Sequence, residues 1–345
     1  MRKYLNSLMY RAQIFLAALF CLYSCNEKGG PELVHLQGKT MGTTYNVKYV
    51  PSKSFPVDKV VVQKKIDKIL VDFNLVASTY DPNSEISKIN NLGSGNNVSL
   101  SSVFKILMNE AIQLNRLSEG VFDPSLSPLI NLWGFGAEGK VKSIPSDKEV
   151  AQRLKVSGMM NFVYDGKGLE KKHSDSALDF SAFAKGYGVD LLAYYLESLQ
   201  MDDYFIEIGG EVRTRTTQRD WRVGIEKPDE SSRGSLTKII KLNGCLATSG
   251  DYRNFYTIAG KKYSHGINFR SGRPVENEIA SVSVFHPSSV MRADGWATTL
   301  MVSNSFVDAL DLINKNNLAA FIIYREKDKL KMFESPQWIK EFGND

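Results

Sequence analysis

Groups able to bind a charged ligand occur together in "LDFSAFAKGYGVD" (178–190), which begins like a buried strand and continues like a helix. Asp179 can bind a ligand N–H or hydroxyl group, and Lys185 can bind phosphate as a point charge. Ser181 can cap the helix, whose N-terminus attracts anions through its free N–H groups and its macrodipole. The two glycines after Lys185 allow close backbone approach. The alternative is a tightly packed helix start with an exposed lysine.

Oxygen ligands for a hard metal ion occur in "RADGWATTLMV" (292–302), which begins a helix. Asp294 and Thr298 are four positions apart and therefore share one helical face. A carboxylate and a hydroxyl suit Mg²⁺ rather than zinc, and Mg²⁺ in turn suits a diphosphate. An aspartate favoured by the helix dipole beside a buried threonine is the alternative.

His265 is the histidine with the most informative context among the four in the chain. It lies in "SHGINFRSGRPV" (264–275), at the end of an expected strand and before turn residues. A histidine there can act as a general base near neutral pH. A histidine with a purely structural hydrogen bond is the alternative.

Two further stretches carry a residue that can cover or stack on a ring. Met41 lies in "GKTMGTTY" (38–45), which is no Walker A loop because Leu33 stands where that loop needs a glycine. Met41 can cover a flat ligand or pack in the core. Tyr80 lies at the turn in "STYDPNSEISKIN" (78–90), where its ring can stack on a ligand or stay a surface tyrosine.

An unusually apolar loop, "GVFDPSLSPLINLWGFG" (120–136), contains Asp123 as its single charge. A loop of this composition must be buried or must line a pocket, and either a planar ligand or an interior loop fits. The Gly-Gly turn of "EIGGEV" (207–212) can admit the edge of a ligand, although such turns are common.

The elements that position these residues are predicted from periodicity. Apolar spacing predicts helices over residues 62–76, 104–117 and 189–199, and Ser146 with Glu149 forms a capping box for another. Runs of β-branched and aromatic residues predict strands at "TYNVKYV", "YFIEI", "WRVGIE", "TKIIKL", "NFYTIA", "ASVSVF" and "LAAFIIY". Helices cluster in the first half and strands in the second, which indicates an α+β fold without a linker between independent domains.

The first 24 residues are predicted to be a signal peptide, with a basic start and the short apolar run "AQIFLAALFCLYS". "LYSC" resembles a lipobox, which would make Cys25 the lipidated first residue of the mature chain. An ordinary signal peptide with an incidental cysteine is the alternative. Residues 25–35 then form a tether, and residues 36–345 form the catalytic domain.

Charge and cysteine content narrow the class of protein further. Loss of the three basic residues in the signal would lower the formal net charge from +5 to +2, which gives no support for nucleic-acid binding. Of the three cysteines, Cys245 alone would remain in the body, so no internal disulfide is possible there. We expect Cys245 to be a small buried residue.

In this order, the quoted stretches resemble the ApbE family, the FAD:protein FMN transferases. The resemblance rests on "MGTTY", "STYDPNSEISKIN", "FDPSLSPLINLWGFG", "LDFSAFAKGYGVD", "EIGGEV", "GIEKP", "TSGDYRNFY", "SHGINFRSGRP" and "ADGWATTLMV". It covers roughly residues 36–325. The family implies one α+β body, related to the T-fold, with mixed or antiparallel sheets flanked by helices, and it implies FAD as substrate with Mg²⁺.

Position by position, the resemblance implies the site residues. The FAD site would consist of Met41, Tyr80, Val121, Phe122, Asp123, Asp179, Lys185 and Ile267. The metal ligands would be the Ala182 carbonyl, Asp294 and Thr298. Lys185 would also serve catalysis by neutralising the diphosphate, and His265 would assist the acceptor hydroxyl.

The family transfers the FMN half of FAD to a threonine or serine hydroxyl of a partner protein and releases AMP. The implied partner is an exported redox protein, and the implied location is the bacterial cell envelope, at the periplasmic face of the inner membrane. FAD hydrolysis to FMN and AMP, or flavin binding by a lipid-anchored protein, are the alternatives. Three residues depart from the family pattern: Gly266 and Phe269 beside the histidine, and Ala297 where some relatives carry a second aspartate.

Overall fold

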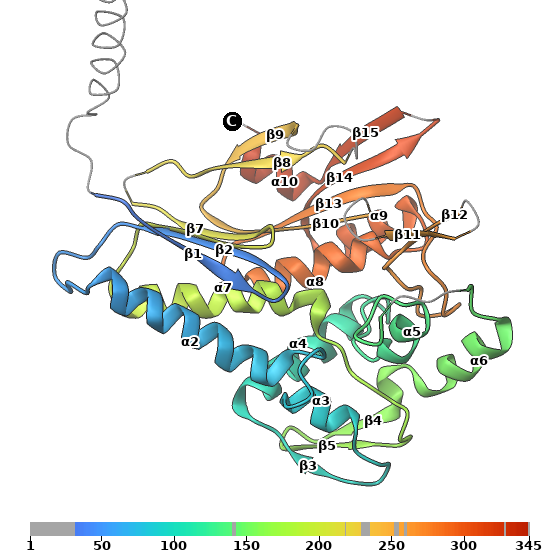
Figure 1. Cartoon of the computed structure of the whole chain (residues 1–345). Coiled ribbons are helices and arrows are strands. Elements are labelled where there is room, and N and C mark those ends of the chain that lie inside the picture. Colours follow the sequence, from blue (N-terminus) through green and yellow to red (C-terminus); the bar gives the residue numbers. More distant parts are fainter. Residues whose placement is uncertain are drawn as a thin grey trace, which may run out of the picture. The chain divides into compact units, whose positions relative to one another are not determined.

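An eight-stranded antiparallel sheet in the order β1-β2-β6-β7-β10-β13-β14-β15 forms the upper layer of Figure 1. Neighbouring strands are not neighbours in sequence at β2-β6, β7-β10 and β10-β13, so long connections run outside the sheet. The strands are β1 (Val34–Thr40), β2 (Thr43–Tyr49), β6 (Tyr204–Ile208), β7 (Glu211–Arg215), β10 (Gly244–Gly250), β13 (Ile279–His286), β14 (Ala319–Glu326) and β15 (Lys329–Glu334).

This computed structural model describes residues 32–139, 143–217, 219–228, 235–251, 255–258, 261–327 and 329–343. Residues 34–345 form one compact unit. The expected signal peptide, Cys25 and most of the expected tether lie outside the described residues. None of the helices in the described ranges is long and apolar enough to cross a membrane.

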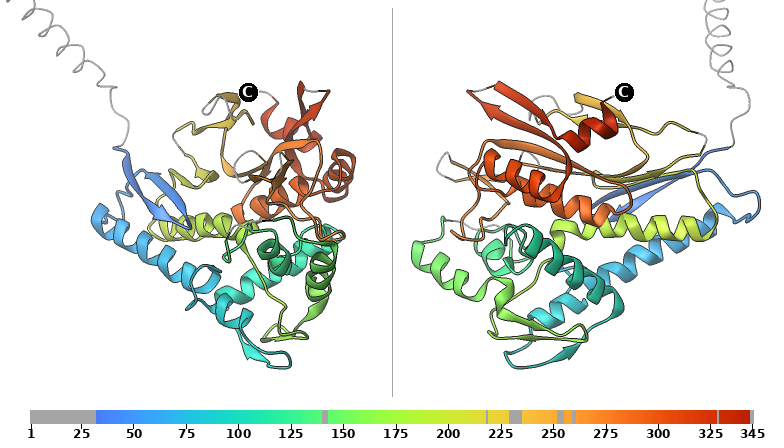
Figure 2. Two further views of the ribbon diagram at one scale, coloured as in Figure 1. Left: turned by 45° about the vertical axis from the view of Figure 1, so that its right-hand side comes forward. Right: turned by 180° about the vertical axis from the view of Figure 1, so that it is seen from behind.

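Two helices, α7 (Ser181–Ser198) and α8 (Val290–Met301), cover one face of the sheet. Figure 2 shows both helices beneath the strands in each of its views. The alternation in β6 explains this packing, because Tyr204, Ile206 and Ile208 are buried in the cluster that also holds residues of α7. The predicted apolar face of residues 189–199 is therefore confirmed as the sheet-facing side of α7.

The other face of the sheet is covered by the hairpin of β8 (Arg222–Glu226) and β9 (Leu236–Lys241) and by α10 (Pro336–Phe342). Their shared cluster includes Trp338, whose ring stacks on Phe321 of β14 at 5.5 Å between centroids. A second hairpin, β11 (Phe255–Ile258) with β12 (Lys261–Ser264), leads directly to His265.

The first half of the chain forms a mainly helical layer below α7 and α8 in Figure 1. It contains α2 (Lys59–Ala77), α3 (Glu85–Asn90), α4 (Ser102–Leu117), α5 (Ser127–Leu132), α6 (Asp147–Val156) and the 3₁₀ turn Met159–Asn161. A small sheet, β3 (Val98–Ser99), β5 (Gly168–Lys171) and β4 (Phe162–Tyr164), lies among these helices, and α9 (Phe306–Asn316) precedes β14.

Several local predictions made from the sequence are confirmed by the structure. Ser146 and Glu149 make both hydrogen bonds of the predicted capping box at α6. The seven predicted strands are present, and the α+β class is confirmed. Cys245 is buried in β10, and burial raises the pKa of its thiol. Strands β1, β7, β10 and β15 were not predicted, because their charged and small residues hide the strand pattern. Of the short strands, β3, β4 and β5 were not predicted either, and β12 was expected only from the position of His265, because two to four residues are too few to show a pattern.

Candidate active site

A cavity of about 530 Å³ opens where the helical layer meets the edge of α7, α8 and β10. Most of the residues predicted for the site line it. They are Tyr80, Val121, Phe122, Asp123, Asp179, Ala182, Lys185, His265, Ile267, Asp294 and Thr298. Residues separated by more than two hundred positions in the sequence therefore meet in one cavity.

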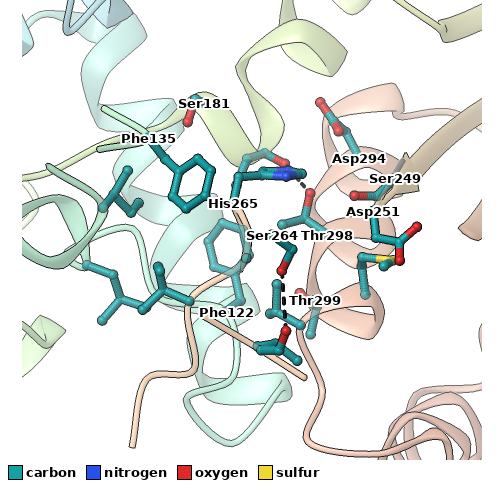
Figure 3. Close-up of a pocket in the computed structure, with 18 of the residues that line it drawn as sticks. Phe122, Phe135, Ser181, Ser249, Asp251, Ser264, His265, Asp294, Thr298 and Thr299 are labelled. Atoms are coloured by element: carbon teal, nitrogen blue, oxygen red, sulfur yellow. Dashed lines mark hydrogen bonds between the residues drawn. The ribbon is translucent and has the colours of Figure 1, made fainter. Parts of the chain in front are cut away.

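The crossing of α7 and α8 brings the predicted metal ligands together. Gly186 lies so close to the start of α8 that a Cβ there would be 2.5 Å from the Val290 carbonyl oxygen. Its N–H donates to Asp294 Oδ2 at 3.0 Å. One turn further along α8, Thr298 Oγ1 donates to the Ala182 carbonyl at 3.2 Å. Figure 3 shows Asp294 and Thr298 on the same helix, with Asp294 near the top of the view and Thr298 near its centre.

A buried carboxylate fixes this crossing from the other side. Asp190 of α7 accepts hydrogen bonds from the first N–H groups of α8, those of Val290 at 3.1 Å and Met291 at 3.0 Å. Arg213 of β7 pairs with the same carboxylate at 2.9 Å. Because a helix N-terminus favours a negative partner, Asp190 holds α8 against α7 and so positions Asp294.

Lys185 lies between two buried carboxylates. Its Nζ is 2.7 Å from Glu211 Oε1 and 3.9 Å from Asp294 Oδ2. Glu211 is the first residue of β7 and follows the Gly209–Gly210 turn, where both glycines have positive φ. The "EIGGEV" motif thus contributes a carboxylate, which the sequence did not single out, as well as a tight turn.

When both carboxyl groups are ionised, they carry more negative charge than Lys185 neutralises. Burial raises the pKa of Glu211 to about 8 against the opposing effect of Lys185, and burial likewise raises the pKa of Asp294. Glu211 Oε2 is buried and has no hydrogen-bond partner among the described residues. A divalent cation would offset this charge, so the carboxylate, hydroxyl and carbonyl oxygens present here fit Mg²⁺.

No group of three or more histidine, cysteine, aspartate or glutamate side chains in the described ranges is arranged to hold a metal ion. Any cation here would therefore need ligands of other kinds. The Ala182 carbonyl and the Thr298 hydroxyl provide them, and Mg²⁺ commonly completes its shell with water and substrate phosphates.

The N-cap residue of α7 is Phe180, which makes no side-chain cap, so the expected cap by Ser181 was wrong. The carboxylate of Asp179, one residue earlier, accepts the first N–H of the helix instead. Ser181 is the first residue of α7, and its N–H donates to Asp179 Oδ1 at 2.8 Å. The Asp179 N–H donates to the Pro124 carbonyl at 2.7 Å, which ties this junction to the apolar loop. Asp179 is buried, and burial raises the pKa of its carboxyl.

The apolar loop 120–136 both lines the cavity and packs in the interior. Phe122 is buried and stacks on Phe183 of α7 at 5.4 Å between ring centroids. Asp123 accepts hydrogen bonds from the Ser125 N–H at 2.8 Å and the Met159 N–H at 3.3 Å, while burial raises the pKa of its carboxyl. The loop is therefore both buried in the interior and part of the cavity lining.

Tyr80 stands at the mouth of the cavity with 70 % of its surface exposed. Together with Asp179 it also lines a second cavity of about 750 Å³, whose other lining residues are mainly polar. The turn that follows it forms as predicted, because the Asn83 N–H donates to Asp81 Oδ1, and Ser84 then caps α3. An exposed ring at the junction of two cavities can stack on a planar ligand without rearrangement.

Met41 lies apart from the other predicted site residues. It occupies the turn between β1 and β2 with a φ of 47°, and it packs against the apolar residues of two core clusters. Its Cε would lie 2.9 Å from a Cβ built on Gly188 of α7. Met41 is absent from the described lining of both cavities, so the arrangement shown favours core packing over covering a ring.

His265 follows β12 directly, as predicted, and lines the cavity. Figure 3 shows its ring between Phe135 and Thr298 in this view, and the Phe135 ring is 6.4 Å away in an edge-on orientation. Gly266 has a steric role, because a Cβ there would be 2.7 Å from Val302 Cγ1 of the cavity wall. Ile267 is buried beside it and pairs with Pro274.

Buried carboxylates, a lysine and oxygen atoms of two helices surround one cavity, an arrangement suited to binding a charged ligand. The sequence pattern of the ApbE family matches residues 41–322, and the chain belongs to that family. It is 39 % identical to a FAD:protein FMN transferase of Vibrio cholerae over 326 residues, which cover 93 % of this chain and 96 % of the relative.

Two solved structures resemble this one throughout. The flavin transferase ApbE from Vibrio cholerae has a TM-score of 0.83 at 37 % identity, covering 90 % of this chain and all of that one. The flavinyl transferase ApbE of Pseudomonas stutzeri, in its apo form, also has a TM-score of 0.83, at 34 % identity, covering 92 % and 99 %. The resemblance that the sequence motifs indicated is therefore confirmed.

Proposed function

We propose that this protein is a FAD:protein FMN transferase, which uses Mg²⁺ to move the FMN half of FAD to a threonine or serine hydroxyl of an acceptor protein and releases AMP. The observation that carries this proposal is the pair of buried carboxylates, Glu211 and Asp294, that share Lys185 at the wall of a cavity of about 530 Å³. The names of the relatives support the flavin transfer.

Attack of a hydroxyl on phosphorus needs positioning and charge neutralisation more than a protein nucleophile. The acceptor oxygen forms a bond to the phosphorus of the FMN half, and the bond from that phosphorus to the AMP oxygen breaks. Lys185 neutralises the diphosphate. Asp294, Thr298 and the Ala182 carbonyl would hold Mg²⁺, which when bound neutralises developing phosphate charge.

His265 is proposed to take the proton of the attacking hydroxyl. We expect His265→Ala to lower the rate of FMN transfer by roughly 10²-fold, since that is the lower range for a positioned general base. Its effect on FAD binding should be small, because Lys185 and the metal ligands are unchanged. Single-turnover flavinylation measures the rate, and an undiminished rate would remove His265 from the mechanism.

Tyr80, Val121, Phe122, Asp123, Asp179 and Ile267 are proposed to bind the flavin nucleotide, as cavity-lining residues. Met41 is kept in this set on the resemblance alone. Tyr80 would stack on the ring, and the buried carboxylates of Asp123 and Asp179 would accept ligand N–H or hydroxyl groups.

One incubation separates transfer from hydrolysis and from simple binding. The protein is mixed with FAD, Mg²⁺ and an exported acceptor domain, and both AMP and in-gel flavin fluorescence are measured. AMP with a fluorescent acceptor supports transfer. AMP alone supports an FAD pyrophosphatase, and bound flavin without AMP supports a flavin-binding protein.

The stabilising effect of Mg²⁺ should increase with pH. Glu211 has a folded pKa of about 8 against an ordinary value of 4.5, so between these values the metal-free folded state keeps a proton that the unfolded state has released. The stability of the metal-free protein therefore falls as pH rises through this window. Mg²⁺ favours the ionised carboxylates and therefore stabilises more at the upper end. We expect a larger Mg²⁺-induced rise in Tm at about pH 8 than at about pH 5.5.

The control for this measurement is Asp294→Asn, which keeps a hydrogen-bond acceptor for the Gly186 N–H but lacks the charge. It should show little Mg²⁺-induced rise at either pH. Equal rises in the unmodified protein at both pH values would contradict the charge argument.

We also propose that residues 1–24 are a signal peptide, residues 25–35 a tether and residues 36–345 the transferase domain. Lipid on Cys25 would anchor the mature chain to the periplasmic face of the inner membrane, near exported redox acceptors. Cys25→Ser should move the protein from the membrane fraction to the soluble periplasmic fraction, because the acyl chains supply the membrane affinity. Unchanged sedimentation with membranes would refute the anchor.

A further inference from the structure

Glu211 is a buried charged residue that the proposed mechanism does not yet use. It lines the main cavity with 2 % of its surface exposed, and its Oε1 accepts the short hydrogen bond from Lys185 Nζ at 2.7 Å. Burying a carboxylate whose second oxygen has no hydrogen-bond partner costs folding free energy. A glutamate at this buried position therefore calls for a functional explanation.

The backbone around Glu211 is built to bring it to Lys185. In the β6–β7 hairpin, Ile208 pairs with Glu211 across the two-residue turn Gly209–Gly210. A Cβ on Gly209 would lie 3.3 Å from Lys185 Cδ, and the glycine therefore leaves room for the stem of the lysine. The turn places the Glu211 carboxylate at the end of the lysine stem, within hydrogen-bond distance of the Lys185 ammonium.

Lys185 has a second possible partner in Asp294. The distance from Nζ to Asp294 Oδ2 is 3.9 Å, against 2.7 Å to Glu211. A movement of the Lys185 ammonium by about 1 Å toward Asp294 would make Asp294 its nearer partner. The flexible lysine stem permits such a movement. Asp294 would then be occupied by an ammonium group, and a cation approaching the same carboxylate would be repelled.

We propose that Glu211 is a positioning residue that holds the Lys185 ammonium away from Asp294, so that Asp294 stays free to bind Mg²⁺ while the ammonium faces the diphosphate. This inference rests on the proposed function, since it takes Asp294 as a metal ligand. Glu211 acts on the metal through Lys185 and is not itself a ligand.

The test measures Mg²⁺ binding by calorimetry, without turnover, in four forms of the whole domain. Glu211→Gln is nearly isosteric and should weaken Mg²⁺ binding by about tenfold or more, because the released Lys185 ammonium would compete with Mg²⁺ for the Asp294 carboxylate. A tenfold loss corresponds to about 1.4 kcal/mol. Lys185→Met should bind Mg²⁺ at least as well as the unmodified protein. In the Lys185→Met background, Glu211→Gln should change Mg²⁺ affinity by less than about threefold.

A matched control is Glu207→Gln in the same hairpin. Glu207 accepts hydrogen bonds from the Gly210 N–H and the Asn46 amide, both at 2.8 Å, and it lies outside the cavity lining. The Glu207→Gln substitution changes the net charge by the same amount as Glu211→Gln and should leave Mg²⁺ affinity unchanged. Equal weakening by Glu207→Gln would overturn the proposal, because net charge alone would then account for the effect.

Two other outcomes overturn the proposal in different ways. If Glu211→Gln weakens Mg²⁺ binding equally with and without Lys185, Glu211 acts directly on the metal rather than through the lysine. If Glu211→Gln binds Mg²⁺ as the unmodified protein does, Glu211 has no part in the metal site. Failure of the unmodified protein itself to bind Mg²⁺ would instead refute the metal in the proposed function.

Discussion

Asp294→Ala is expected to lower Mg²⁺-dependent FMN transfer by roughly 10³-fold, the upper range for loss of one preorganised electrostatic group. The carboxylate is buried, is held by the Gly186 N–H at 3.0 Å and has its pKa raised by burial. Its removal takes away the charged metal ligand together with the acceptor that fixes the α7–α8 crossing. Steady-state AMP release and acceptor fluorescence with FAD and Mg²⁺ measure the loss.

Two further variants separate charge from structure in this result. Asp294→Asn keeps an oxygen for the Gly186 N–H and should retain the thermal stability of the domain while losing most of the activity. Asp308→Ala removes an exposed aspartate from the first turn of α9, which does not line the cavity, and should leave activity unchanged. Full activity of Asp294→Asn would show that the carboxylate does not bind the metal.

The sequence predicts the elements of this fold better than their arrangement. Helix α6 and its capping box depend on contacts between residues three apart, and local pattern is therefore sufficient to find them. Strand β10, with the sequence "GCLATSG", has no local signal of comparable strength. It becomes a central strand because β7 and β13 pair with it on either side, and such long-range pairing leaves no periodic trace.

The distinction between local pattern and long-range contact also explains which site residues the sequence predicted. Asp294 and Thr298 share a helical face at a spacing that the sequence displays, and the cavity confirms that they lie together. Glu211 was missed because a glutamate at a strand start is ordinarily exposed. Its burial depends on the β6–β7 turn and on Lys185, which is 26 residues away.

The site therefore depends on the approach of two helix backbones as much as on its charged side chains. Lys185 and Ala182 belong to α7, whereas Asp294 and Thr298 belong to α8. Their relative positions are set where Gly186 meets the Val290 carbonyl, since both partners there are backbone atoms that cannot move aside independently. A single methyl group at this contact would change the separation of the two helices.

Gly186→Ala should accordingly be among the most damaging small substitutions in the chain. The added Cβ would lie 2.5 Å from the Val290 carbonyl oxygen and 2.8 Å from the Met291 Cα. Overpacking of this kind costs about 3 kcal/mol, which should lower Tm by about 5 °C in a unit of this size. Displacement of Asp294 and Thr298 from Ala182 should reduce transfer by roughly 10²-fold even in the folded fraction.

The matched control is Gly188→Ala, two residues further along the same helix. There the added Cβ would meet Met41 Cε at 2.9 Å and Ile208 Cδ1 at 3.3 Å, which are the ends of flexible side chains. The gain in helix propensity of about 1 kcal/mol offsets this adjustment, so stability and activity should change little. Thermal unfolding and single-turnover transfer measure both variants. Equal losses in the two would show that α7 tolerates no added methyl, and equal retention would show that the Gly186 contact does not set the geometry of the site.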